Sequence, residues 1–187
     1  MSRPNFIAFP KIPRLRRTVV ISEKIDGTNA QIHVTECGEV YAGSRNRWIT
    51  PDADNYGFAK WVKLHEEELK TGLGPGTHYG EWWGSGIQRG YGLNNKKFSL
   101  FNTARWNKDN LPACCSVVPV ISTAELSSMS PIEEALKLLR INGSIAAPRF
   151  MNPEGVVVYM VASGTMHKVL LEHDELPKGK MATTVEA

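Results

Sequence analysis

Apolar and polar residues alternate along several short stretches of the chain, and this alternation predicts most of its strands. A turn at Cys37-Gly38 separates the second predicted strand from the third. Strands mixed with a few helices, without regular alternation of strand and helix, are typical of an α+β fold with largely antiparallel sheets. The predicted strands are 18–23, 29–35, 39–42, 77–83, 97–103, 117–121, 155–162 and 165–171.

Two segments have helical periodicity. Over 55–70, apolar side chains recur at three- and four-residue steps, which predicts an amphipathic helix. A second helix is predicted to begin with the capping sequence at 130–133 (SPIE) and to end at Gly143. The apolar stripe of the first helix is expected to face the core; it consists of Phe58, Trp61, Val62 and Leu69.

Composition places the chain among globular proteins of one domain. It has 187 residues, of which 42% are hydrophobic and 22% charged. No apolar run approaches the roughly 20 residues of a membrane span. Cys37, Cys114 and Cys115 match neither a disulfide framework nor a zinc-ligand spacing, so reduced thiols and a cytoplasmic protein are expected. A bacterial or viral origin is compatible with this expectation.

The charge distribution permits a polyanionic partner without requiring one, because the net charge is only +3. Basic residues gather in an N-terminal arm at 11–17, where they can contact phosphates or remain solvated. We expect 1–178 to form one catalytic domain and 179–187, which is rich in Lys and Thr, to be a mobile tail.

The most informative stretch is 23–29 (EKIDGTN), in which Lys24 ends an apolar strand just before an Asp-Gly turn. A lysine amine forms covalent intermediates once it is neutral, which requires burial or neighbouring positive charge. The alternative is an ordinary surface lysine before a hairpin turn.

Further segments, in a fixed order, resemble the covalent nucleotidyltransferase superfamily of ATP-dependent RNA and DNA ligases and mRNA capping enzymes. The similarity is greatest to the RNA ligase branch. It implies a nucleotidyltransferase (adenylation) domain with largely antiparallel sheets flanked by a few helices. The segments that carry the resemblance are 24–27 (KIDG), 44–47 (SRNR), 79–82 (YGEW), 98–102 (FSLFN) and 154–158 (EGVVV).

The resemblance also implies roles for individual residues. Lys24 is expected to become adenylylated, with Asp26, Arg45 and Lys168 as the other catalytic residues. Glu154 and Asp26 are expected to hold Mg²⁺ or Mn²⁺, which prefer oxygen ligands. The residues expected to bind ATP are Glu23, Gly27, Asn29, Glu81, Phe101 and Lys168.

Two features depart from the family pattern. The fifth motif usually offers two lysines separated by one residue, whereas 166–170 (MHKVL) contains only Lys168. His167 is its neighbour, but adjacent strand residues face opposite sides. Slower lysine adenylylation, or neutralisation of phosphate by another residue, would follow. No room for an appended OB-fold domain remains after Lys178, so a protein partner is a candidate source of one.

The reaction implied is formation of lysyl-AMP, transfer of AMP to a 5′-phosphate, and attack by a 3′-hydroxyl that releases AMP. The ends of RNA or of another polynucleotide are the expected partner, with no membrane. The alternative from a different class is a nucleotide- or RNA-binding module without sealing activity. Within the superfamily, a DNA ligase or a GTP-using capping enzyme remains an alternative.

The remaining aromatic and histidine residues allow both structural and functional interpretations. Trp82, Trp83 and Tyr91 can form a stacking platform for single-stranded nucleic acid or pack in the core. Arg89 belongs to a glycine-rich loop that is expected near the nucleotide. Packing or surface roles are expected for His33, His65 and His78, which show no ligand spacing.

Overall fold

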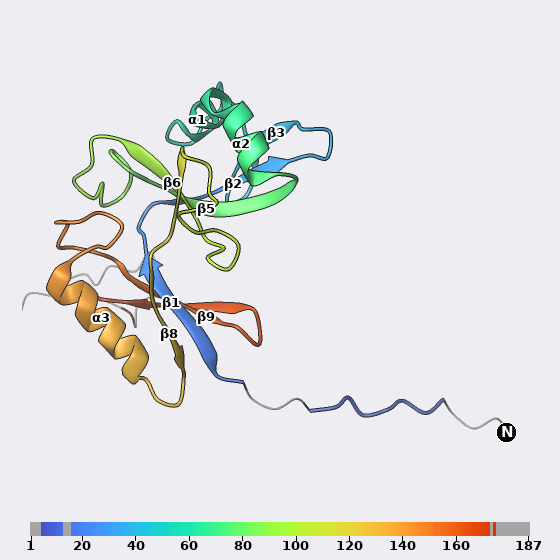
Figure 1. Ribbon diagram of the computed structural model, residues 1–187, viewed down its shortest axis with the longest axis vertical. Helices are drawn as coiled ribbons and strands as arrows, with labels where there is room; N and C mark the ends of the chain where they lie inside the picture. Colours follow the sequence, from blue (N-terminus) through green and yellow to red (C-terminus); the bar gives the residue numbers. More distant parts are fainter. Residues whose placement is uncertain (1–4, 13–15, 173, 175–187) are drawn as a thin grey trace, which may run out of the picture.

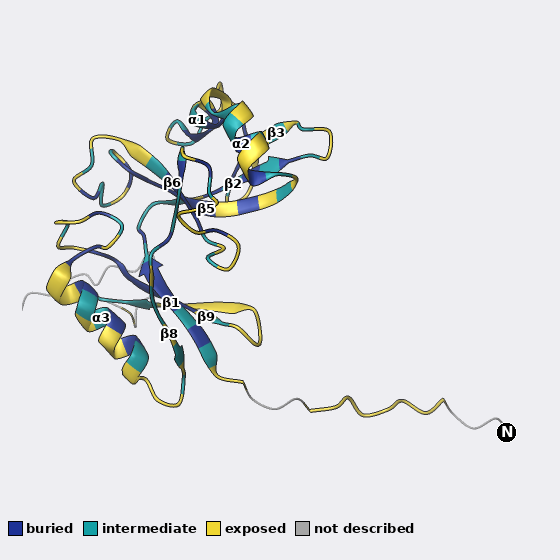
Figure 2. Ribbon diagram, in the orientation of Figure 1, coloured by how far each residue is buried: buried dark blue, intermediate teal, exposed yellow. Residues whose placement is uncertain are grey.

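Two β-sheets and three helices make up the part of the chain that the computed structural model describes, namely residues 5–12, 16–172 and 174 (Figure 1). The predicted tail at 179–187 lies outside the described residues, as does Arg14 of the basic arm. Residues 5–12 extend away from both sheets and are exposed (Figure 2). Within the described residues, no helix has the length and apolar character that crossing a membrane requires.

The four-stranded sheet has the order β10-β9-β1-β8, with every neighbouring pair antiparallel. Helix α3 (Ser130–Asn142) packs against β8 and β9 on one face of this sheet. Alternation along β1 points Val19 and Ile21 toward the helix, where they are fully buried with Leu139. The strands are β1 (Thr18–Lys24), β8 (Val120–Glu125), β9 (Gly155–Met160) and β10 (Thr165–Leu170).

The six-stranded sheet has the order β4-β3-β2-β5-β6-β7 and is antiparallel except for the pair β6 and β7. Helices α1 (Phe58–Leu64) and α2 (Glu66–Leu73) pack against β3 on one face. There the centroid of the buried Phe58 ring lies 5.3 Å from the ring centroid of Trp82 and 5.1 Å from that of Phe98. The strands are β2 (Thr28–Val34), β3 (Val40–Ser44), β4 (Trp48–Ile49), β5 (Gly76–Gly84), β6 (Lys96–Leu100) and β7 (Cys115–Val117).

No helix within the described residues covers the opposite face of the six-stranded sheet, and this face carries exposed aromatic side chains. Tyr41, Trp48 and Tyr79 are 44%, 54% and 59% exposed. Strand register places them on one face, because Tyr41 pairs with His33 and Tyr79 with Gln31, two residues along β2. The rings of His33 and Tyr41 each lie 6.0 Å from that of Trp48.

The α+β class with mainly antiparallel sheets is confirmed, but two predicted elements are each divided in two. The helix predicted over 55–70 is divided at His65, which ends α1 and precedes α2. The strand predicted over 117–121 is two strands, β7 and β8, because Pro119 lacks a backbone N–H for the ladder. Its carbonyl instead accepts the N–H of Glu23, 2.9 Å away.

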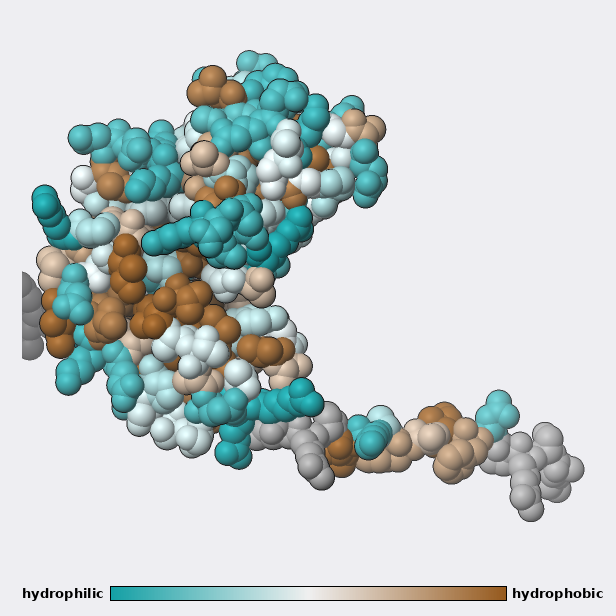
Figure 3. Space-filling view, viewed as in Figure 1, coloured by the Kyte–Doolittle hydropathy of each residue, from teal (hydrophilic) through white to brown (hydrophobic). Residues whose placement is uncertain are grey.

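The chain leaves the four-stranded sheet at the end of β1 and enters the six-stranded sheet at β2, so residues 25–27 lie between the two sheets. A small apolar cluster fills this junction and includes the buried residues Ile25, Trp83 and Tyr91. The end of β1, where Lys24 is the last residue, and the turn that follows it are therefore held where the two halves of the molecule meet (Figure 1). The space-filling view shows an indentation between the same two halves (Figure 3).

Candidate active site

Lys24 is the last residue of β1, and its register partner on β9 is Gly155. This pairing brings the preceding residue, Glu154, next to the lysine: Lys24 Nζ and Glu154 Oε2 are 2.5 Å apart. The side chains are only 19% and 5% exposed, so the ion pair is largely shielded from water. A potential nucleophile and a potential metal ligand are thus in direct contact, although 130 residues separate them.

Asp26 is held by an arginine from the glycine-rich loop. Arg89 Nε donates to Asp26 Oδ2 over 3.1 Å, and Arg89 Nη1 donates to Asn152 Oδ1 over 2.8 Å. The backbone N–H of Asp26 donates to Tyr91 Oη over 2.7 Å. Burial is the main cause that raises the pKa of Tyr91, so the phenol stays protonated. Arg89 therefore links the turn after Lys24 to the segment before Glu154.

Glu81 of β5 holds the same turn from the other sheet. Its Oε1 accepts the N–H of Gly27 at 3.1 Å, and its Oε2 accepts Asn29 Nδ2 at 3.2 Å. Gly27 is required by close packing, since a Cβ there would lie 2.5 Å from the carbonyl oxygen of Trp82. The predicted pair Gly27 and Asn29 thus meets the predicted Glu81 in one hydrogen-bonded unit.

A cavity of about 160 Å³ opens beside this unit, on the sheet face without helices. Phe101, whose predicted role is stacking on a base, lines it together with Arg45 of the β3–β4 turn. The aromatic surface, the arginine and the side chain of Asn29 suit a nucleotide with a charged phosphate. The lining residues are Asn29, Ala30, Gln31, Ser44, Arg45, Tyr79 and Phe101.

Lys168 lies on β10 opposite Val157, which in turn pairs with Ser22 of β1. Because side chains alternate along a strand, Lys168 and Lys24 belong to the same face of the four-stranded sheet. His167 belongs to the opposite face. Lys168 is exposed, so its amine is accessible to a phosphate group on this side of the sheet.

Glu23 does not share the face of Lys24. Its carboxylate is buried and accepts hydrogen bonds from Ser144 Oγ at 2.5 Å and from the N–H groups of Ile145 and Ala146 at 2.8 and 2.9 Å. Burial is the dominant cause that raises the pKa of this carboxyl. The Glu23 side chain thus anchors the loop before β9, which differs from the nucleotide-binding role expected for it.

The stacking platform considered for Trp82, Trp83 and Tyr91 is wrong, because all three are at most 2% exposed. The adjacent tryptophans do face opposite sides: Trp82 is in the core under α1, and Trp83 is in the junction cluster. Conversely, sequence reasoning missed Asn152 as a partner of Arg89. The position of Asn152, two residues before Glu154, is the one signal that points to it.

This arrangement suits group transfer to an amine. Lys24 lies at the junction of the sheets, Glu154 and Asp26 supply oxygen ligands of the kind that Mg²⁺ or Mn²⁺ prefers, and the cavity lies along β2. Two largely antiparallel sheets that meet at a strand-end lysine agree with the nucleotidyltransferase fold that the sequence resemblance implies. A family model described as RNA ligase matches residues 17–170, so the chain belongs to the RNA ligase family.

Solved structures of an RNA ligase from Naegleria gruberi are similar to the chain. A glutamate-to-alanine variant with ATP and Mn superposes with a TM-score of 0.59 and 18% identity, over 90% of this chain and 57% of that one. A lysine-to-alanine variant with ATP and Mn gives 0.58 and 17%, over 85% and 52%. A variant without ligand gives 0.57 and 20%, over 82% and 49%.

At these identities the structural similarity shows the fold, which agrees with the family match. The chain spans about half the length of these ligases. No curated protein sequence matches it.

Proposed function

We propose that this chain is the nucleotidyltransferase core of an ATP-dependent RNA ligase, which joins 3′-hydroxyl and 5′-phosphate ends through a lysyl-AMP intermediate. The observation that carries the proposal is the shielded contact between Lys24 and Glu154, next to the unit formed by Gly27, Asn29 and Glu81. Membership of the RNA ligase family supports the same reaction.

In the first step, Lys24 Nζ attacks the α-phosphorus of ATP, the bond to the pyrophosphate oxygen breaks, and the amine loses a proton. Arg45 and Lys168 supply positive charge for the phosphate oxygens, and such preorganised charge is usually the largest catalytic contribution. A bound Mg²⁺ or Mn²⁺ would neutralise further phosphate charge. Glu154 and Asp26 are the carboxylates that would hold it. The similar N. gruberi ligase was solved with ATP and Mn, which supports this choice of cofactors.

The nucleotide is proposed to occupy the cavity of about 160 Å³ along β2. There Phe101 offers a ring for stacking on the purine, and Glu81 offers carboxylate oxygens to the ribose hydroxyls. Both Glu81 oxygens already accept hydrogen bonds from the turn after Lys24, so ribose binding and the placement of Lys24 depend on one residue.

RNA is proposed to approach across the exposed β3–β4 turn. Arg45 and Arg47 are exposed there, next to the nucleotide cavity and the exposed Trp48. Lys11, Arg16 and Arg17 of the arm add exposed positive charge. These side chains favour contacts with phosphates, which position a strand without reading its sequence.

The domain organisation and location are also proposals. Residues 1–178 would form the catalytic unit, and a partner protein would supply an accessory nucleic-acid-binding domain. The three free cysteines support a reducing compartment such as the cytoplasm.

The test is incubation of the purified chain with radiolabelled ATP and magnesium, followed by peptide mapping of the adduct. Covalent AMP is expected on Lys24. The Lys24→Ala variant should form none, and Lys24→Arg should not restore labelling because arginine stays protonated. Lys137→Ala, an exposed lysine change on α3, is the matched control and should label normally.

An adduct on another residue would contradict the assignment of Lys24. A wild-type chain that binds ATP without gaining AMP mass would favour the binding module. Faster labelling from GTP would indicate a capping-type enzyme.

A further inference from the structure

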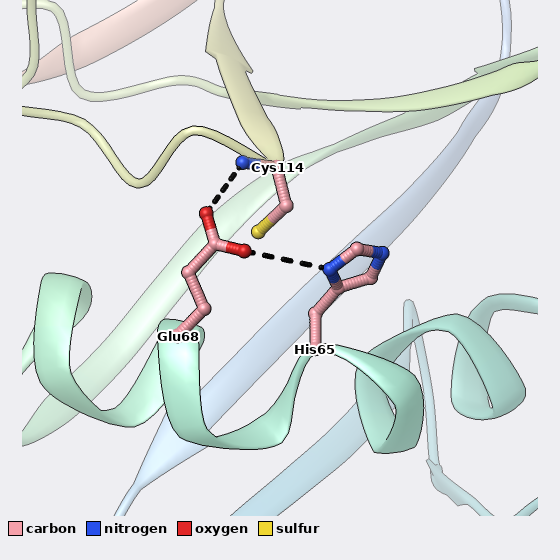
Figure 4. Close-up of side chains that lie close together, drawn as sticks. All are labelled: His65, Glu68 and Cys114. Atoms are coloured by element: carbon pink, nitrogen blue, oxygen red, sulfur yellow. Dashed lines mark hydrogen bonds and ion pairs between the residues drawn. The ribbon is translucent and has the colours of Figure 1, made fainter.

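A histidine, a glutamate and a cysteine gather on the helical side of the six-stranded sheet, apart from the proposed active site (Figure 4). His65 lies at the junction of α1 and α2, Glu68 lies in the first turn of α2, and Cys114 directly precedes β7. The nitrogen, oxygen and sulfur ligand atoms all lie within 4.8 Å of one another. Glu68 and Cys114 are 46 residues apart in the sequence, so no local spacing of ligand residues predicts this cluster.

Several contacts fix the three side chains. Glu68 Oε1 accepts the backbone N–H of Cys114 at 2.7 Å, and Glu68 Oε2 lies 3.5 Å from His65 Nδ1. The His65 ring also packs against Trp61, with 5.0 Å between centroids. The donors are therefore arranged before any ligand arrives.

Position indicates which of two neighbouring thiols would act as the ligand. Cys115 Sγ is 3.9 Å from Cys114 Sγ and belongs to a buried residue. The Sγ atom of Cys114 is the sulfur that lies within 4.8 Å of the ligand atoms of His65 and Glu68. Cys114 is also partly exposed, so it is the sulfur donor, in the thiolate form that binds metals.

We propose that His65, Glu68 and Cys114 form a Zn²⁺ site. An imidazole nitrogen, a carboxylate oxygen and a thiolate are the ligand types that Zn²⁺ takes, usually in tetrahedral geometry. Mg²⁺ prefers oxygen ligands alone, so the ion of the proposed active site would not compete well here. Water can complete the tetrahedron, because the side chains of His65 and Glu68 are 30% and 39% exposed.

The bound ion would stabilise the edge of the six-stranded sheet. Strand β7 is only three residues long and pairs with β6 alone within this sheet. An ion shared by α2 and Cys114 would tie the start of β7 to the helical layer. A metal ion that binds the folded state and not the unfolded state raises the thermal stability of the protein. This role is independent of the proposed function, since none of the three ligands lines the nucleotide cavity.

The experiment uses the full chain, reduced and freed of metal with a chelator, and titrates it with Co²⁺ as a coloured substitute for Zn²⁺. One Co²⁺ per chain is expected, with the absorption of a thiolate-to-cobalt charge-transfer band, and Zn²⁺ should displace it. His65→Ala and Cys114→Ser should each weaken binding by at least 10-fold, and Cys114→Ser should also abolish the charge-transfer band. Cys37→Ser, which removes an exposed cysteine elsewhere, should change neither.

Two further measurements separate metal binding from misfolding. Glu68→Gln keeps a carbonyl oxygen for the Cys114 N–H, so this variant should fold normally. Its affinity for Co²⁺ should nevertheless be lower than that of the wild type, because the carboxylate charge is lost. Zinc should raise the melting temperature of the wild type and of Cys37→Ser, but not that of Cys114→Ser. Absence of stoichiometric binding, a cobalt spectrum without the charge-transfer band, or equal binding by Cys114→Ser would each overturn the proposal.

Discussion

At the scale of single residues, the Glu154 carboxylate serves both Lys24 and the proposed metal ion. In the structure, Glu154 Oε2 contacts Lys24 Nζ. A metal ion held by this carboxylate would draw on its negative charge and weaken the ion pair with the lysine. Metal binding would then favour release of the amine for nucleophilic attack.

The first prediction concerns this carboxylate. Glu154→Gln keeps the size of the side chain and removes its charge, so metal binding should weaken and adenylylation should slow by about 10–100-fold. Titration of Mg²⁺ against the rate of lysyl-AMP formation measures both effects. Glu133→Gln, an exposed change on α3, is the control. An unchanged metal dependence in Glu154→Gln would show that Glu154 is not a metal ligand.

The second prediction concerns Gly27. A Cβ at this position would meet the carbonyl oxygen of Trp82 at 2.5 Å and the Cβ of Trp83 at 2.7 Å. Overpacking of this kind typically costs about 1–3 kcal/mol. Gly27→Ala should lower the free energy of unfolding by this amount and also displace the turn that Glu81 holds, so adenylylation should fall.

Gly74→Ala is the comparison for Gly27→Ala. Gly74 has open space around it but a φ of 69° and a ψ of 177°, a backbone region that is essentially restricted to glycine, so alanine there meets a backbone penalty of about 1–3 kcal/mol without a steric clash. The Gly74→Ala variant should have a lower free energy of unfolding than the wild type, and its Lys24 should still be labelled with AMP. If Gly27→Ala labels as well as Gly74→Ala does, the turn does not position Lys24.

The individual residues also show how far sequence reasoning reaches. Lys24, Glu81 and Glu154 were predicted from short motifs, and the structure brings them to one junction. The hydrogen bonds of Arg89 with Asp26 and Asn152 were not predicted, because each of these two residues lies 63 residues from Arg89 in the sequence. Motifs identify chemical groups, whereas long-range contacts depend on how the sheets meet.

At the scale of elements, β1 presents side chains on both faces of the four-stranded sheet. Lys24 faces the proposed active site, and its neighbour Glu23 faces the loop at 144–147. Strand alternation alone predicts that these adjacent side chains diverge. The sequence could not show what Glu23 contacts, because Ser144 lies 121 residues away.

The third prediction is a pH dependence that originates at Glu23. Burial raises its pKa above the ordinary value of 4.5, so the folded chain binds this proton more tightly than the unfolded chain. The resulting stability is complete below pH 4.5 and is lost as the pH rises through the raised pKa. One group contributes at most about 1.4 kcal/mol per pH unit to this slope.

Urea unfolding at a series of pH values measures the dependence. In Glu23→Gln the side chain has no proton to lose, so the loss of stability above pH 4.5 should be smaller than in the wild type. The glutamine carbonyl can still accept the N–H groups of Ile145 and Ala146, so the loop should remain folded. Parallel pH profiles for the two proteins would show that Glu23 does not titrate in this range.

Element boundaries also show where local patterns stop being informative. The apolar stripe predicted over 55–70 is real, with Phe58, Val62 and Leu69 all buried, although His65 divides the helix. Periodicity reports which face is buried, and it does not report a change of axis between two helices that share that face. The short strand β4 was missed because two residues contain no periodicity.

At the scale of the whole molecule, exposed basic residues of the arm and of the β3–β4 turn are the proposed contacts for a strand of RNA. Figure 3 shows hydrophilic residues over much of the half that carries α1 and α2, with more apolar surface on the half that carries α3. The fourth prediction is that Arg45→Ala and Arg47→Ala each weaken binding of single-stranded RNA and make it less sensitive to salt.

Each phosphate contact that is lost should reduce the slope of log affinity against log salt concentration by about 0.7 for a single strand. Filter binding over a series of KCl concentrations gives this slope. Lys137→Ala on α3 removes one exposed charge from the other half of the molecule and should leave the slope unchanged. Equal slopes for all three variants would move the RNA path away from the β3–β4 turn.

The uneven exposure of the tryptophans provides a built-in optical probe. Trp82, Trp83 and Trp106 are buried, whereas Trp48 is 54% exposed beside Arg47. Indoles in water emit at longer wavelengths than indoles in a core, so the red edge of the intrinsic fluorescence should come chiefly from Trp48. An RNA base that stacks on this ring would quench the red edge and leave the buried emission in place, so strand docking at the β3–β4 turn becomes visible without any label.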